Sequence, residues 1–152
     1  MVNIRQRLAR HLLVGLDTSV WIYHFEGHPR YAKLVRTVLE AVKTGQPRAI
    51  VSVVTLMELT VRSYRLNQPV VANHYEAVLR RFPNTRLVDT TPTVARRAAQ
   101  LRATYSLLPA DALQVATSIV AGATAWITND QALRRLAPVI EIIVLDDLLE
   151  RQ

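Results

Sequence analysis

The chain has 152 residues and no cysteine, which excludes disulfide bonds and cysteine-based zinc sites. Half of its residues are hydrophobic, so the composition favours a single folded domain over a disordered chain. No apolar run approaches the roughly 20 residues of a membrane-spanning helix. The apolar run near the N-terminus ends at Asp17, too early and with the wrong flanks for a signal peptide. We therefore expect a cytoplasmic protein without a membrane segment.

The charge balance is strongly basic, with 19 basic and 12 acidic residues and a net charge of +7. All of the basic residues except Lys33 and Lys43 are arginine, whose forked guanidinium suits phosphate. A basic surface favours polyanions such as RNA. A solvated, arginine-rich surface explains the same excess equally well, so charge alone does not assign a nucleic-acid function.

Apolar patterns alternate along the chain between short buried runs and one-faced helical segments. The run from Leu12 to Leu16 is continuous, as in a strand buried on both faces of a parallel sheet. Strands are predicted at 12–16, 49–54, 86–89, 125–128 and 140–145, and helices at 20–25, 31–42, 55–66, 70–82, 92–105, 108–122 and 131–136. This alternation predicts an α/β domain over 12–149, with helices on both faces of a parallel sheet. Residues 1–11 are interpreted as an N-terminal extension.

Four of the acidic residues occupy equivalent places in this pattern. Asp17 and Asp130 follow predicted strands, whereas Glu58 and Asp111 lie in the first turns of predicted helices. In a parallel sheet the carboxyl ends of the strands, and the helices that leave them, meet at one edge. We therefore expect the four carboxylates to lie close together.

Each of these acids also has a purely structural explanation. Asp17 and Asp130 could cap helices, and Asp111 could complement a helix N-terminus. Thr55 and Glu58 have the spacing of a capping box. Four carboxylates at one edge, however, repel one another unless a cation lies between them. Clustered oxygen ligands are what Mg²⁺ or Mn²⁺ prefers, and such an ion polarises a phosphoryl oxygen and generates hydroxide from water.

Four short motifs carry a family resemblance. They are Leu16-Asp17-Thr18-Ser19-Val20, Ser52 with Met57-Glu58-Leu59, Leu108-Pro109-Ala110-Asp111-Ala112-Leu113 with Ala116-Thr117, and Ile127-Thr128-Asn129-Asp130. In this order and spacing the chain resembles a PIN domain, most of all the toxin of a VapBC-type toxin–antitoxin pair. The resemblance implies a Rossmann-like three-layer α/β/α sandwich with a five-stranded parallel sheet. It also implies a Mg²⁺- or Mn²⁺-dependent endoribonuclease, a homodimer and a VapB-like antitoxin partner.

The resemblance also assigns roles to residues. Asp17, Glu58, Asp111 and Asp130 match the acidic, metal-binding positions of the family, and Thr128 matches the polar residue that often precedes the last acid. The implied cleavage products carry a 5′-phosphate and a 3′-hydroxyl. The segment 1–11 departs from the family pattern, since many such toxins begin almost at the first strand.

Other function classes fit the sequence less well or remain open. An aspartyl-phosphate phosphatase would need an Asp where Ser19 stands, and a response-regulator receiver would need a late lysine, but none follows Lys43. A housekeeping RNA-processing PIN nuclease is not excluded by the sequence. A non-catalytic RNA-binding module is disfavoured because all four acids are present.

Overall fold

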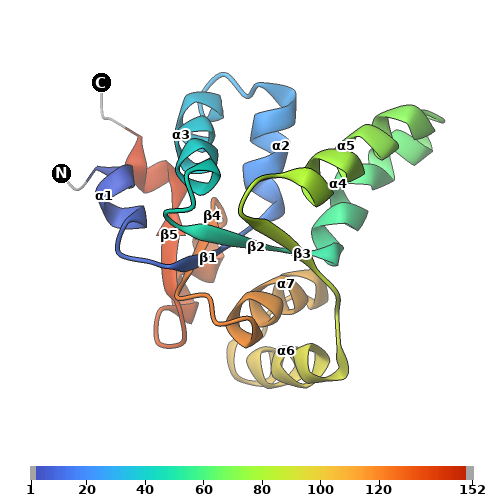
Figure 1. Cartoon of the computed structure of the whole chain (residues 1–152). Coiled ribbons are helices and arrows are strands. Elements are labelled where there is room, and N and C mark those ends of the chain that lie inside the picture. Colours follow the sequence, from blue (N-terminus) through green and yellow to red (C-terminus); the bar gives the residue numbers. More distant parts are fainter. Residues whose placement is uncertain (1–2, 150–152) are drawn as a thin grey trace.

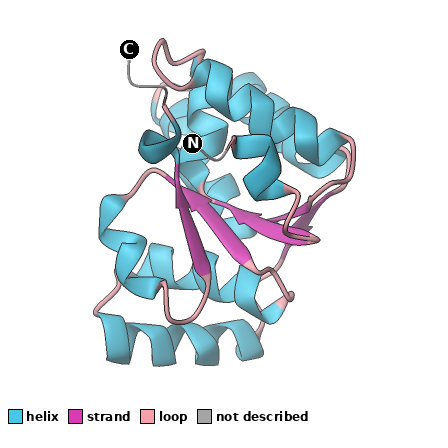
Figure 2. Cartoon of the chain, turned by 90° about the vertical axis from the view of Figure 1, so that its left-hand side faces the viewer, coloured by secondary structure: helices cyan, strands magenta, loops and turns pink. Residues whose placement is uncertain are grey.

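Five parallel strands form one central sheet. The computed structural model describes residues 3–149. The strands are β1 (Leu13–Leu16), β2 (Arg48–Ser52), β3 (Thr85–Val88), β4 (Ala125–Thr128) and β5 (Glu141–Val144), in the order β3-β2-β1-β4-β5. Every neighbouring pair is parallel, so all five carboxyl ends point to the same edge (Figures 1 and 2).

Helices cover both faces of this sheet. One apolar core joins it to α1 (Ile4–Leu8), α2 (Thr18–Glu26), α3 (Ala32–Lys43), α4 (Val53–Arg65), α5 (Pro69–Arg81) and the 3₁₀ turn η2 (Leu145–Leu148). A second core joins the opposite face to α6 (Pro92–Tyr105), α7 (Pro109–Val120) and the 3₁₀ helix η1 (Gln131–Leu136). The two layers lie above and below the sheet in Figure 2. The expected three-layer α/β/α sandwich with five parallel strands is thus confirmed.

The central strand β1 requires glycine because helix α7 packs directly on it. A Cβ atom at Gly15 would overlap the Ser118 hydroxyl and lie 2.6 Å from a ring carbon of Trp126. Real Cβ atoms do not come this close to other atoms, so only glycine allows α7 to pack at this distance. This contact fixes the position of α7, and therefore of Asp111 in its first turn.

The beginning of α4 differs from the sequence prediction. The helix starts at Val53, and Ser52 is its N-cap, with the serine hydroxyl accepting a hydrogen bond from the Val54 amide at 3.1 Å. Thr55 therefore lies inside the helix, and the predicted Thr55–Glu58 capping box is wrong. The apolar residues Val53 and Val54 continue the strand pattern in the sequence, although they form the first turn of a buried helix.

The segment before β1 is helical and packs on the domain. Leu8 in α1 is fully buried in the same core as α3. Arg7 forms an ion pair with Glu141 of β5 at 3.0 Å, and the His11 ring lies 2.7 Å from the other oxygen of the same carboxylate. The N-terminal residues from Asn3 onward are therefore part of the packed structure. No helix within residues 3–149 is long and apolar enough to cross a membrane.

Candidate active site

The four sequence-predicted acids come together at the carboxyl edge of the sheet. Asp17 directly follows β1, and Asp130 lies two residues after β4. Glu58 lies on α4, which leaves β2, and Asp111 lies in the first turn of α7. In addition to burial, which is the largest cause, the negative charges of Asp111 and Glu58 raise the pKa of Asp17, and those of Asp130 and Glu58 raise the pKa of Asp111. The acids are thus close enough to repel one another.

Asp17 is oriented by β4 rather than by its own helix. It occupies the N-cap position of α2, but its side chain makes no capping hydrogen bond. The Thr128 hydroxyl donates to Oδ2 of Asp17 instead, and the same hydroxyl accepts from the Asp130 amide at 3.0 Å. Thr128 is fully buried. The capping explanation of Asp17 therefore fails, and Thr128 connects two of the acids.

Burial is the main reason why the Asp17 carboxyl resists ionisation. Desolvation raises the pKa of Asp17 from 3.8 to about 6, although the hydrogen bond from Thr128 opposes this rise. Desolvation is also the largest cause of the raised pKa of Asp111, and the nearby Arg135 guanidinium partly offsets it. A cation at this edge would favour the ionised form of both groups.

Glu58 accepts two hydrogen bonds through a single oxygen. The Thr18 hydroxyl donates to its Oε1 at 2.7 Å, and the Gln114 side-chain amide donates to the same oxygen at 2.5 Å. Thr18, Thr55 and Gln114 are all buried, and their polar atoms contact one another at 3.0–3.3 Å. Sequence reasoning missed Gln114. Its signal was a lone amide three residues after Asp111, on the same side of the helix and within the apolar run Ala112–Ala116.

Asp130 is exposed and caps the next element. Its Oδ1 accepts a hydrogen bond from the Ala132 amide at 2.9 Å, so Asp130 does cap a helix as its structural explanation requires. No hydrogen bond to its Oδ2 is present within residues 3–149. The neighbouring Asn129 accepts from the Asp146 amide at 2.9 Å and donates to the Tyr23 hydroxyl at 3.1 Å. These contacts fix the chain that leaves β4 and thereby the position of Asp130.

The carboxylates fit a hydrated divalent ion better than a fully protein-bound one. Within residues 3–149, no group of three or more His, Asp or Glu side chains has the spacing to hold one metal ion. Mg²⁺ usually keeps several waters and contacts one or two carboxylates directly. Oxygen donors from four acids, two of them with raised pKa values caused partly by one another, have the chemistry that such an ion requires.

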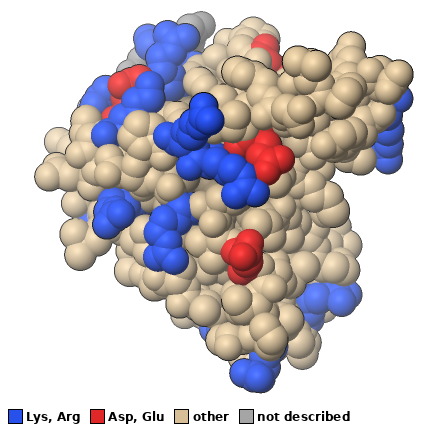
Figure 3. Space-filling model, turned by 45° about the vertical axis from the view of Figure 1, so that its right-hand side comes forward, with Lys and Arg blue, Asp and Glu red and all other residues tan. Residues whose placement is uncertain are grey.

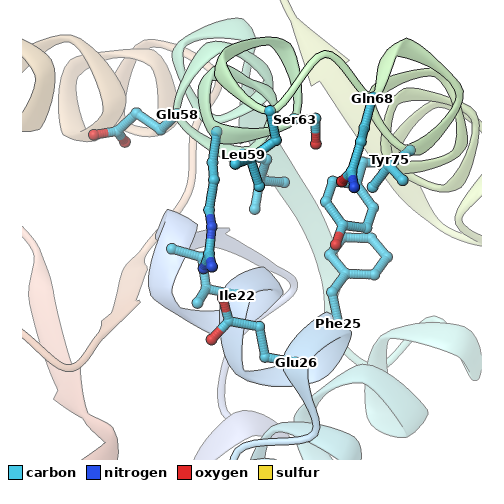
Figure 4. A pocket seen from close by; sticks show the side chains of 11 residues that line it. Ile22, Phe25, Glu26, Glu58, Leu59, Ser63, Gln68 and Tyr75 are labelled. Carbon is cyan, nitrogen blue, oxygen red and sulfur yellow. The ribbon is translucent and has the colours of Figure 1, made fainter.

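A pocket of about 330 Å³ opens beside Glu58, between α2 on one side and α4 and α5 on the other (Figure 4). Apolar side chains form most of its wall, and Phe25 and Tyr75 stack there with ring centroids 4.3 Å apart. Glu26 and Arg62 also line it. In Figure 4 the Glu58 carboxylate points away from the aromatic pair, so an occupant of the pocket would reach the acidic edge at one end.

Basic side chains lie next to acidic ones on the surface. In Figure 3, Lys and Arg side chains gather beside the acidic groups near the middle of the face that is shown. Arg135, whose positive charge lowers the pKa of Asp111, is exposed on η1. A phosphate chain laid across the face in Figure 3 would meet both basic and acidic side chains.

A family model described as PIN domain matches residues 14–138, which include all four acids and Thr128. The chain belongs to the PIN-domain family. Proteins of this family are nucleases. No curated protein matches the sequence.

Solved structures similar to this PIN domain include three toxin–antitoxin complexes. VapBC2 from Rickettsia felis, bound to a DNA fragment from its promoter, has a TM-score of 0.70 at 16% identity over 87% of this chain and 98% of that chain. A toxin–antitoxin complex from Klebsiella pneumoniae has a TM-score of 0.66 at 22% identity, over 87% of this chain and 97% of that chain. DNA-bound VapBC from Salmonella typhimurium has a TM-score of 0.66 at 23% identity, over 88% of this chain and 98% of that chain. At these identities the similarity establishes the shared fold.

Proposed function

We propose that this PIN domain is a Mg²⁺- or Mn²⁺-dependent endoribonuclease and the toxin of a toxin–antitoxin pair. The observation that carries the proposal is the convergence of Asp17, Glu58, Asp111 and Asp130 on one sheet edge, with mutual repulsion in the absence of a cation. The fold it shares with toxin–antitoxin complexes supports the toxin assignment.

In this proposal Asp17, Asp111 and Asp130 hold the ion directly or through water, and Glu58 completes the site. A bound ion would supply a water of lowered pKa and would neutralise charge on the phosphoryl oxygens. Thr128 keeps Asp17 turned towards the site through its hydrogen bond. Exposed arginines such as Arg135 position the RNA phosphates, and the products carry a 5′-phosphate and a 3′-hydroxyl.

A purified-protein assay tests the chemistry. RNA should be cleaved in Mn²⁺ or Mg²⁺ and left intact in EDTA, and sequencing of the ends should show 5′-phosphates. Asp111→Asn should abolish cleavage without unfolding the protein. Cleavage that continues in EDTA, or at the wild-type rate in Asp111→Asn, would remove the metal site from the proposal.

The partner we propose is a VapB-like antitoxin whose apolar segment fills the pocket between α2, α4 and α5. A cationic side chain at the end of that segment would complement Glu58 and Glu26, which both line the pocket. Leu66 lines the pocket and is 55% exposed, so Leu66→Glu should weaken the complex without unfolding the toxin. Leu12→Glu, at the opposite sheet edge and 90% exposed, is the control.

Co-expression distinguishes a toxin from a housekeeping nuclease. Growth should stop when the chain is expressed alone and resume when the adjacent small gene is expressed with it. Light scattering should show a homodimer of the free toxin at tens of micromolar. Unimpaired growth with the active enzyme would instead favour the housekeeping nuclease.

A further inference from the structure

The amide of Gln114 is almost completely buried and lies between two helices that carry acids of the site. It is 1% exposed on α7, three residues after Asp111, and it reaches Glu58 on α4. A buried amide without partners is costly, so its partners account for its place in this otherwise apolar part of the helix. Its contacts therefore show what it does.

The contacts fix which end of the amide faces Glu58. Oε1 of Gln114 lies 3.2 Å from the Thr18 hydroxyl and 3.3 Å from the Thr55 hydroxyl, and Nε2 lies 2.5 Å from Oε1 of Glu58. With the amide reversed, its oxygen would face a carboxylate oxygen at that short distance. The NH₂ group must therefore point at Glu58.

Counting hydroxyl protons gives the direction of the whole network. Each threonine has one hydroxyl proton to donate. The Thr18 proton goes to Glu58, which is the nearest acceptor at 2.7 Å. The Thr55 proton is then free for Gln114 or for Thr18. Both donors to Glu58 thus meet at Oε1, and within residues 3–149 no hydrogen bond to its Oε2 is present.

We infer that Gln114 is a positioning residue that holds Oε1 of Glu58, so that Oε2 faces the metal-binding edge of the site. The inference rests on the proposed function. Outer contacts of this kind orient metal ligands, and their loss typically weakens metal affinity or activity by about 10- to 100-fold. Gln114, which is 1% exposed, acts through its hydrogen bond to Glu58.

The test compares Gln114→Met, which keeps the length of the side chain but removes the amide, with Thr117→Val. Thr117 is equally buried on α7, but within residues 3–149 its hydroxyl hydrogen-bonds only to the Leu113 carbonyl, at 2.7 Å. Mn²⁺ titration calorimetry and RNA cleavage are measured for both variants. We expect a loss of about 10- to 100-fold in Mn²⁺ affinity for Gln114→Met. For Thr117→Val we expect Mn²⁺ affinity within about twofold of wild type, since neither hydrogen bond to Glu58 comes from Thr117.

A double variant separates positioning from general packing. In a Glu58→Gln background, Gln114→Met should cause no further loss of Mn²⁺ affinity, because the residue it orients is already changed. If Gln114→Met does not fold, Thr18→Val removes the other donor to Oε1 with a shape-matched side chain and should give the same loss.

The outcomes separate this inference from the function on which it rests. Wild-type affinity in Gln114→Met would overturn the positioning role alone. An equal loss with and without Glu58 would also overturn it, by showing that Gln114 acts through the fold. A wild-type protein that neither binds Mn²⁺ nor cleaves RNA would overturn the proposed function, and the positioning role with it.

Discussion

Replacing Asp17 by asparagine should stabilise the metal-free protein. Burial raises the pKa of Asp17 to about 6, so at neutral pH the folded protein carries a charge that its surroundings oppose. An asparagine at this position would carry no charge, and its side-chain oxygen can still accept the hydrogen bond from Thr128. The substitution therefore removes the desolvation cost and keeps the contact with β4.

The size and sign of this effect follow from the pKa. The folded pKa of about 6 lies above the ordinary value of 3.8. Between these pH values the unfolded chain loses the proton while the folded chain retains it, so the stability of the wild type falls as pH rises and stays constant above pH 6. At about 1.4 kcal/mol for each pKa unit, the raised pKa lowers the free energy of unfolding of the wild type by about 3 kcal/mol above pH 6. About half of this loss is present near pH 5.

Urea unfolding in EDTA at about pH 5 and about pH 7.5 measures this difference. The free energy of unfolding of Asp17→Asn should exceed that of the wild type by up to about 3 kcal/mol at the higher pH, and by about half as much at the lower pH. Asp130→Asn is the control, because Asp130 is exposed and asparagine can cap η1 equally well. An Asp17→Asn variant no more stable than the wild type at either pH would refute the reasoning.

Four further substitutions test separate parts of the structure. Glu58→Gln should keep the free energy of unfolding within about 1 kcal/mol of wild type but reduce RNA cleavage by orders of magnitude. Ser52→Ala, which removes the cap of α4, should lower the free energy of unfolding by about 1 kcal/mol and retain cleavage. Urea unfolding and initial cleavage rates measure both effects. Leu8→Ala should destabilise the domain by about 2–5 kcal/mol. An unchanged urea midpoint of unfolding would show that α1 contributes little to stability. Gly15→Ala should cost about 1–3 kcal/mol, measured by thermal melting, because the added methyl group collides with Ser118.

Local patterns in the sequence were sufficient for the layer architecture and the place of the acids. Continuous apolar runs indicated strands buried on both faces, and one-faced periodicity indicated the helices that cover them. Because parallel strands bring their carboxyl ends to one edge, the positions of Asp17 and Asp130 after strands predicted that they would lie together. The motif match to the PIN family followed from the same short segments.

Segment boundaries were less certain because apolar runs do not distinguish the end of a strand from the start of a buried helix. The pattern therefore places Val53 and Val54 in a strand and allows Thr55 as a helix cap, although α4 begins at Val53 and its cap is Ser52. The short helix α1 was not predicted, because its five residues are too few to show a periodic pattern. Only its packing, with Leu8 in the core and Arg7 on Glu141, shows that it belongs to the domain.

The contacts that orient the acids depend on tertiary structure alone. Thr128 reaches Asp17 across 111 residues of sequence, and Gln114 reaches Glu58 across 56. Periodicity in a sequence reports which face of an element is buried, but it does not report which element lies against that face. The strand order β3-β2-β1-β4-β5 and the packing of α7 on Gly15 decide these pairings. The sequence thus determined which carboxylates lie at this edge of the sheet, and the packing of the helices determined how each carboxylate is held.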